Sequence, residues 1–236
     1  GKGLVALAMV LGIYGALLAY IIGVGNSLNA VLPQLNSVAW SIMFFAAASA
    51  IVYFGLKAVE KSELLLSFLT VAVIIIIIVV AATSDRFSAA NLTKTSVQNI
   101  FLPYGVVLFA FLGAVAVPEM REELGSRGRK LLKKAIILAG IVPIALYALF
   151  AVSVVGISGL STGQIATISI GKALGERMVV FANLFAVLAM STSFIALGLA
   201  LREMYNYDYK LNKKIAWVLT CAVPMLAFLL GLKGFI

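Results

Sequence analysis

The sequence predicts an all-α, polytopic integral membrane protein with seven transmembrane helices. Of its 236 residues, 63% are hydrophobic and only 11% are charged, whereas soluble domains carry about a quarter charged residues. No charged residue occurs between Lys2 and Lys57. A single helix over that stretch would be about 80 Å long, more than twice the thickness of the bilayer core. The stretch therefore holds two spans and a turn.

The seven predicted spans account for nearly the whole chain, so we expect a single transmembrane domain. Each is an apolar run of the length that crosses a bilayer, which takes about 17 to 25 residues. The spans are expected over residues 4–24, 38–56, 64–83, 102–118, 135–156, 178–201 and 215–232.

The first two spans are separated by an uncharged turn, expected over residues 26–37 because it contains asparagines and Pro33. Trp40 near the start of the second span fits the aromatic belt at a membrane interface. Residues 57–63 alternate lysine and glutamate with apolar residues and predict a short charged turn before the third span.

The later connections are polar and differ in length. A polar loop is expected over residues 85–100. It includes Asn91-Leu-Thr93, which matches a glycosylation sequence so short that it commonly occurs by chance. Basic residues fill the expected loop at 121–134, and a charged, tyrosine-rich loop is expected at 202–214. Residues 158–176 are too polar to span, and Ser161 is positioned to cap a short helix that ends near Leu174.

The fourth span combines helix-weakening residues at the depth of the bilayer centre. Gly113 leaves peptide groups uncovered, and Pro118 removes a backbone donor. Open backbone at that depth is tolerated where it lines a cavity, and such broken helices hold the substrate in many secondary transporters. The residues therefore predict a helix broken around 109–118. They leave open an unbroken span in which Gly113 lets a neighbouring helix pack closely.

The charges are distributed asymmetrically across the predicted membrane. Thirteen of the 18 lysines and arginines fall on the side where the first span begins, which places the N-terminal end of this chain in the cytoplasm. This pattern explains the net charge of +9 without nucleic acid. It also argues against a rhodopsin-like receptor, which starts outside the cell. We therefore expect a multi-pass protein of the cytoplasmic membrane.

The composition excludes several classes of chemistry. There is no histidine, Cys221 is the single cysteine, and no acidic or basic residue lies near the middle of a span. We find no nucleophile–base pair, metal spacing or phosphate-binding loop, so no enzyme is expected. Polar function must come from hydroxyls, amides and freed backbone.

The densest group of hydroxyls is Ser191-Thr192-Ser193, about midway through the sixth span. Hard cations prefer oxygen ligands, so these hydroxyls are candidates for a sodium site. The alternative is that each hydroxyl bonds a carbonyl one turn back and serves packing alone.

Two stretches resemble a known family. Residues 109–120, with Phe109-Ala-Phe111-Leu-Gly113 and Pro118, resemble the sixth helix of the amino acid/auxin permease family. Residues 192–205 resemble its eighth helix, especially in the prokaryotic aromatic amino acid permease branch, and residues 15–23 look like its third. The resemblance implies an internal fragment that covers the third to ninth helices of a five-plus-five inverted-repeat core. Further helices of the same transporter are then expected upstream and downstream.

The resemblance implies secondary active transport of an amino acid by alternating access, as a symporter coupled to sodium or protons. Two alternatives stay open: a channel or passive facilitator, and a non-transporting scaffold. Beyond the lipid bilayer, the amino acid substrate is the implied partner. The implied substrate site comprises Phe109, Ala110, Phe111, Leu112 and Gly113, with Tyr14 or Tyr20, and the implied ion site comprises Ser191, Thr192 and Ser193.

Overall fold

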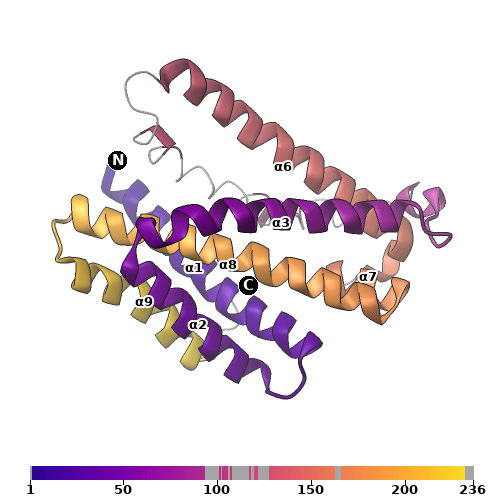
Figure 1. Ribbon diagram of the computed structural model, residues 1–236, viewed down its shortest axis with the longest axis horizontal. Coiled ribbons are helices and arrows are strands. Elements are labelled where there is room, and N and C mark those ends of the chain that lie inside the picture. The colour runs from indigo at the N-terminus through magenta and orange to yellow at the C-terminus, as the bar shows by residue number, and fades with distance from the viewer. Residues whose placement is uncertain are drawn as a thin grey trace. The chain divides into compact units, whose positions relative to one another are not determined.

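The computed structural model describes residues 2–93, 101, 103–105, 107, 117, 120–121, 128–162 and 166–231. Its elements are all helical, which confirms an all-helical protein over the described residues (Figure 1). They are α1 Lys2–Val31, α2 Ser37–Phe54, α3 Leu56–Ala82, η1 Ala89–Thr93, α6 Arg129–Ser158, η5 Gly159–Ser161, α7 Ala166–Leu174, α8 Glu176–Tyr207 and α9 Lys213–Leu229.

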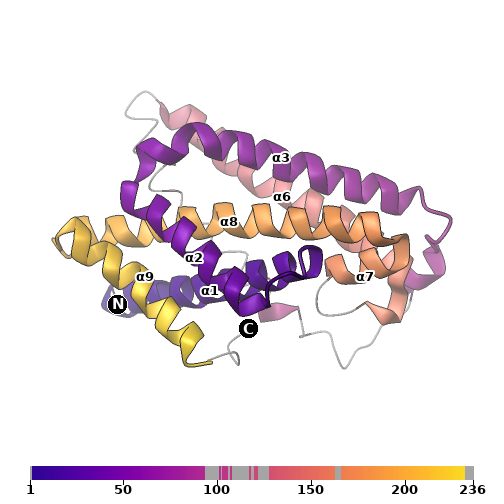
Figure 2. The same ribbon diagram turned by 60° about the horizontal axis from the view of Figure 1, so that its bottom comes forward.

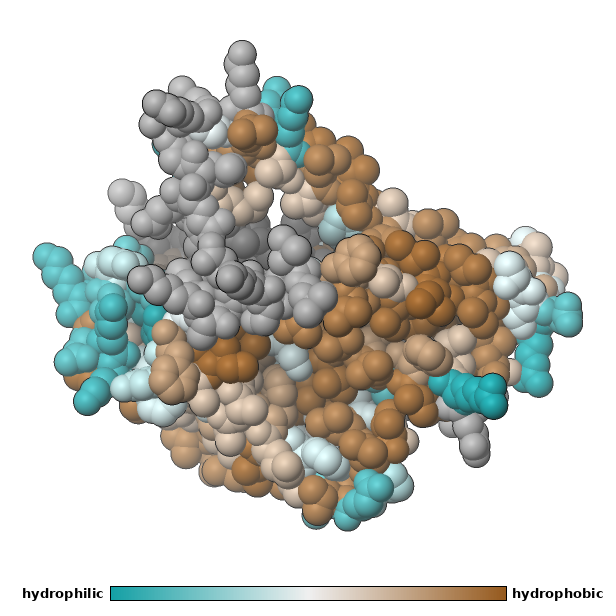
Figure 3. Space-filling view, viewed as in Figure 1, coloured by the Kyte–Doolittle hydropathy of each residue, from teal (hydrophilic) through white to brown (hydrophobic). Residues whose placement is uncertain are grey.

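Four of the described helices are long and apolar enough to cross a membrane: α1, α2, α6 and α8. The apolar part of α3, Leu66–Ala82, is shorter. The predicted fourth span, residues 102–118, lies mostly outside the described residues. The helical membrane protein is therefore supported, while the count of seven spans and the inverted-repeat core stay predictions. Figure 3 shows that the visible face of the described residues is largely hydrophobic.

The turn between α1 and α2 is shorter than the sequence suggested. The helix α1 continues through Asn26 to Val31, so the prediction of a turn from residue 26 is wrong. The helix ends just before the residue that precedes Pro33, where a proline disfavours helical backbone. Asn36 then caps α2, because its Oδ1 accepts a hydrogen bond from the Ala39 N–H at 2.8 Å.

The expected charged turn at residues 57–63 is also wrong. The chain reverses at Gly55, whose φ of 83° suits glycine, and α3 begins at the next residue. In the same way α6 begins at Arg129, inside the loop expected at 121–134, and α8 continues to Tyr207. Lysine, arginine, glutamate and methionine are good helix formers, so the charges do not end these helices.

The short helix after the fifth predicted span is present. It is α7, and it ends at Leu174 as predicted, after the single turn η5. The cap that Ser161 was expected to provide involves residues 163–165, which lie outside the described residues. Pro143 lies inside α6 and Pro224 inside α9.

The chain divides into two compact units. Unit 1 comprises α1, α2, the start of α3, α8 from Ala186 onward, and α9. Its helices α1, α2 and α9 pack against one another (Figure 2). The buried side chains in this unit include Leu17, Ile21, Val24, Val52 and Phe194. Tyr14, Tyr20 and the hydroxyl triplet Ser191-Thr192-Ser193 all belong to unit 1.

Unit 2 contains the rest of α3, η1, α6, α7 and the beginning of α8. Its core comprises Ile77, Val154, Ile170, Met178 and Ala182. The η1 segment covers the end of α6, since the Ser88 N–H and Asn91 Nδ2 both donate to Gly156 O at 2.9 Å. The asparagine of the glycosylation sequence therefore has a structural role.

The α1–α2 contact depends on a glycine. A Cβ at Gly25 would lie 2.0 Å from Ser41 Oγ and 2.5 Å from Ser37 O, whereas a Cβ at Gly15 on the same helix would meet nothing within 4 Å. We expect Gly25→Ala to destabilise the protein, because overpacking costs about 1–3 kcal/mol. Such a loss lowers the melting temperature by about 2–4 °C per kcal/mol in a chain of this size.

The matched control is Gly15→Ala, which should leave the melting temperature unchanged or slightly higher, because alanine favours helix over glycine. Thermal unfolding of the detergent-solubilised protein measures both. Equal melting temperatures for the two variants would contradict the close contact.

Candidate functional site

The predicted substrate residues Phe109, Ala110, Phe111, Leu112 and Gly113 lie outside the described residues. Tyr14, Tyr20 and the three hydroxyl residues of α8 are described. They belong to unit 1, on the helices α1 and α8.

Two contacts set the direction of α1 and α8 relative to each other. The Tyr14 and Tyr205 hydroxyl oxygens lie 2.8 Å apart, and a Cβ at Gly23 would lie 2.4 Å from Met190 Sδ. Because the later residue on α1 meets the earlier residue on α8, the two helices run antiparallel.

This arrangement brings two parts of the predicted site to one level. Tyr20 precedes Gly23 by about one helical turn, and Ser193 follows Met190 by about one turn. Because the two helices are antiparallel, moving back along α1 from Gly23 and forward along α8 from Met190 leads toward the same end of the pair. Tyr20 and the hydroxyl triplet therefore occupy the same level of the α1–α8 pair, which we call the α1–α8 seam. It is the candidate functional site among the described residues.

The hydroxyl triplet cannot surround an ion by itself. The helix α8 is unbroken through it, and successive side chains on a helix point about 100° apart. Thr192 Oγ1 donates back to Ala189 O at 3.0 Å and Leu188 O at 3.2 Å, the packing arrangement considered from the sequence. All three residues are half-buried. An ion site here would need ligands from a second helix.

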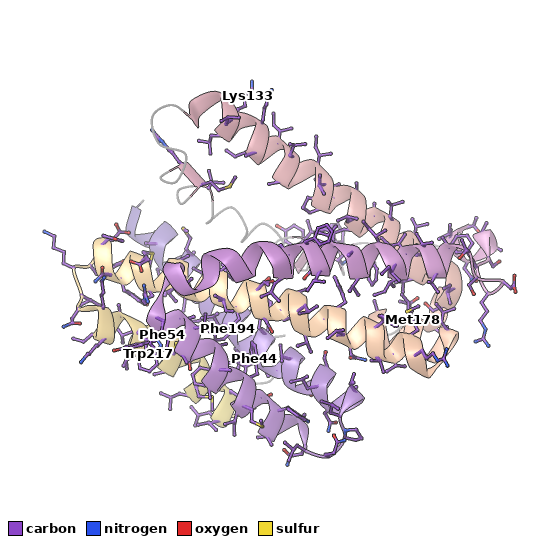
Figure 4. All side chains as sticks on the ribbon, in the orientation of Figure 1. Phe44, Phe54, Lys133, Met178, Phe194 and Trp217 are labelled. Atoms are coloured by element: carbon purple, nitrogen blue, oxygen red, sulfur yellow. The ribbon has the colours of Figure 1, made fainter. Side chains whose placement is uncertain are left out.

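The residue after the triplet fixes this part of α8 against α2. Phe194 is 1% exposed, and its ring makes edge-to-face contacts with Phe44 and Phe45 at centroid distances of 5.4 and 6.4 Å. Figure 4 labels Phe194 and Phe44. One turn later Gly198 would place a Cβ 3.0 Å from Val52 Cγ2. These contacts with α2 fix the rotation of α8 about its own axis, and hence the directions in which the three hydroxyl side chains point.

Tyr14 joins three helices through its hydroxyl. It donates to Leu219 O of α9 at 3.1 Å, which uses its single hydrogen. Tyr205 must therefore be the donor in the 2.8 Å bond between the two tyrosines. This network satisfies the Tyr14 hydroxyl within unit 1. A role for Tyr14 or Tyr20 in substrate binding stays a prediction.

Arg202 is a residue whose role the sequence did not reveal. It was expected in a loop, but it lies in α8, is 7% exposed, and donates to the carbonyls of Val52 and Tyr53 at the end of α2. It also pairs with Glu203. Gly55 leaves room for it, because a Cβ there would lie 3.0 Å from Arg202 Nη2.

The guanidinium satisfies carbonyls that the end of α2 leaves without intrahelical partners, and its charge is favourable at that negative end of the helix dipole. The spacing of Phe194, Gly198 and Arg202 could have indicated that Arg202 faces α2. Steps of four residues place them on one face of α8.

A cavity of about 320 Å³ lies beside the C-terminal part of α1. Its polar lining includes Asn26, Ser37 and Ser41, and Ser41 Oγ already donates to Ile21 O at 2.8 Å. The volume is at the lower end of the range for small-molecule pockets, about 300–1,000 Å³. None of the residues singled out from the sequence as a site lines it.

The described part of the chain offers no cluster of side chains typical of a transition-metal site. No group of three or more His, Cys, Asp or Glu residues gathers there. Asn183 is buried and donates to Val179 O of its own helix at 2.8 Å.

Comparison with known proteins finds one matching family and one distant curated relative. A model of the tryptophan/tyrosine permease family matches residues 1–236. The curated protein "Glutamine transporter 2" of Aliivibrio fischeri (strain ATCC 700601 / ES114) is 23% identical over 222 residues, which cover 89% of this chain and 57% of that protein. The chain thus spans little more than half the length of that relative. No solved structure matches.

Removal of the Arg202 charge should destabilise unit 1. In Arg202→Met, the carbonyls of Val52 and Tyr53 lose their donor, and an unsatisfied buried polar group costs about 1–3 kcal/mol. Thermal unfolding in detergent measures the loss, and Arg202→Lys should recover part of it.

The matched control is Arg177→Met, which removes the same charge from an exposed position on the same helix. It should change the melting temperature little. A loss as large as that of Arg202→Met would show that charge alone, rather than the contact with α2, is responsible.

Proposed function

This chain belongs to the tryptophan/tyrosine permease family, and on that premise we propose that the protein carries an amino acid across the cytoplasmic membrane by secondary active transport. The observation that carries the proposal is the family match over residues 1–236. The distant relative named as a glutamine transporter and the four long apolar helices support it.

The substrate class follows from the same two comparisons. The family is described by tryptophan and tyrosine, so an aromatic amino acid is the first candidate. Glutamine is the second, because the relative that matches 89% of this chain carries that name. Uptake of labelled tryptophan into proteoliposomes, competed in turn by tyrosine and glutamine, separates the two. Competition by glutamine alone would assign the second.

We place the substrate at the broken helix predicted around 109–118. Backbone freed at Gly113 offers donors and acceptors to the polar groups of an amino acid, and Phe109 and Phe111 offer an aromatic wall. Alternating access then requires that this part of the chain open to each side of the membrane in turn. The sequence pattern and the family membership support this placement.

The coupling ion, sodium or a proton, is proposed to act at the α1–α8 seam. The hydroxyls of Ser191, Thr192 and Ser193 are half-buried, at the level of Tyr20 on α1. Thr192 donates its hydrogen to its own helix, and its oxygen lone pairs stay available to a cation. Because α8 is unbroken there, the remaining oxygen ligands must come from another helix.

Gly113→Leu should abolish uptake while leaving membrane insertion intact, because the larger side chain fills the space at the broken helix. Gly105→Leu is the matched control in the same predicted span, since a Cβ at Gly105 meets nothing within 4 Å. Labelled tryptophan uptake, normalised to inserted protein, is the measurement. Retained uptake in Gly113→Leu would remove the broken-helix site. Conductance without saturation would favour the channel instead.

Thr192→Ala and Ser193→Ala should each raise the sodium concentration needed for half-maximal uptake. Loss of one oxygen ligand weakens the site, and the ordinary contribution of a hydrogen bond suggests roughly a two- to tenfold change. Ser153→Ala is the control, because this buried serine donates only to Leu149 O on its own helix in unit 2. Uptake driven by a proton gradient and indifferent to sodium would contradict a sodium site at these hydroxyls.

A further inference from the structure

A groove of about 560 Å³ lies between the C-terminal end of α2 and the start of α9, within unit 1. It is separate from the α1–α8 seam. It is lined by Ala50, Tyr53, Phe54, Lys214, Trp217 and Val218. Five of these six residues carry no formal charge, and the sixth is a lysine.

The aromatic wall of the groove is held in place. Trp217 Nε1 donates to Ser49 O at 2.8 Å, so the indole has its polar atom satisfied within the protein. The Tyr53 ring packs edge-on against Trp217 at a centroid distance of 5.2 Å and against Phe54 at 5.6 Å. Figure 4 labels Phe54 and Trp217 at neighbouring helix ends. The wall is therefore a preformed apolar surface.

Positive charge gathers at one end of this wall. Lys214 lines the groove, Lys213 precedes it, and Lys210 lies in the turn from α8 to α9; all three are exposed. The acidic residues of the same segment are Glu203, which is paired with Arg202, and the exposed Asp208, and neither lines the groove. Figure 3 shows hydrophilic residues around this turn, beside hydrophobic helix surface.

We propose that this groove binds an anionic phospholipid of the surrounding membrane. One acyl chain lies along Trp217, Val218 and Ala50, and the headgroup phosphate contacts the Lys214 ammonium. A tryptophan, a tyrosine and a lysine together mark the depth of the headgroups. The apolar wall accepts a chain from any lipid. Only the lysines distinguish an anionic headgroup from a zwitterionic one, which is why charge complementarity selects the anionic class.

The test compares two lipids that differ in net headgroup charge. The purified protein in detergent is titrated with phosphatidylglycerol or with phosphatidylcholine of the same acyl chains, and native mass spectrometry counts the lipids retained. Phosphatidylglycerol should bind several-fold more tightly. Lys214→Gln should lower phosphatidylglycerol affinity about fivefold, the usual contribution of one lysine near a membrane surface. It should lower phosphatidylcholine affinity less, because the choline cation of that headgroup offsets its phosphate charge.

Lys213→Gln is the matched control, because it removes the same charge from the adjacent position, which does not line the groove. It should lower phosphatidylglycerol affinity less than Lys214→Gln. A second variant, Val218→Trp, fills the groove at an exposed position and should weaken both lipids.

Three outcomes would overturn the proposal. Equal affinity for the two lipids would show that the lysines do not select an anionic headgroup. Equal losses in Lys213→Gln and Lys214→Gln would assign the preference to general surface charge. If the protein forms a dimer and Val218→Trp abolishes that dimer, the groove binds a second copy of the chain rather than a lipid.

Discussion

The arrangement of unit 1 depends on the close approach of α1 and α2 at Gly25. Because this residue has no side chain, Ser41 can pack against α1 and donate its hydroxyl hydrogen to Ile21 O at 2.8 Å. Small residues serve membrane helices in this way, since lipid provides no hydrophobic force that would press helices together. With α2 fixed by this contact, its far end presents the carbonyls of Ser49, Val52 and Tyr53 to the neighbouring helices.

Those carbonyls determine where α8 and α9 attach. Trp217 of α9 binds Ser49 O, and Arg202 of α8 binds Val52 O and Tyr53 O. Each donor comes from a helix distant in sequence, and Arg202 satisfies two carbonyls at the end of α2 that lipid could not satisfy. The helix that carries the hydroxyl triplet is thus attached through carbonyls at the end of α2. The same geometry leaves Arg202 Nε without a hydrogen-bond partner among the described residues.

The sequence predicted the helical class of the described residues, because apolar run length is a local property. It failed at the ends. A turn was expected at residues 57–63 and a loop at 202–214, yet α3 includes the first and α8 continues to Tyr207. Charge marks where a chain leaves lipid and not where a helix stops. The sequence also missed the Tyr14–Tyr205 bond and the burial of Arg202, which depend on how distant helices meet. The family resemblance is confirmed at the level of aromatic amino acid permeases. The site residues, the coupling ion and the part of the transporter covered stay predictions.

The two indole contacts give the protein a built-in optical probe of one unit. Its only tryptophans are Trp40 and Trp217, and both lie in unit 1. Each indole N–H is tied to a backbone carbonyl, Leu32 O at 3.0 Å and Ser49 O at 2.8 Å. Intrinsic tryptophan emission therefore reports on α2, α9 and the α1–α2 turn, while unit 2 contributes no tryptophan signal. A rearrangement confined to unit 2 would leave the tryptophan emission unchanged. The emission therefore shows whether unit 1 responds when a substrate without an indole ring is added.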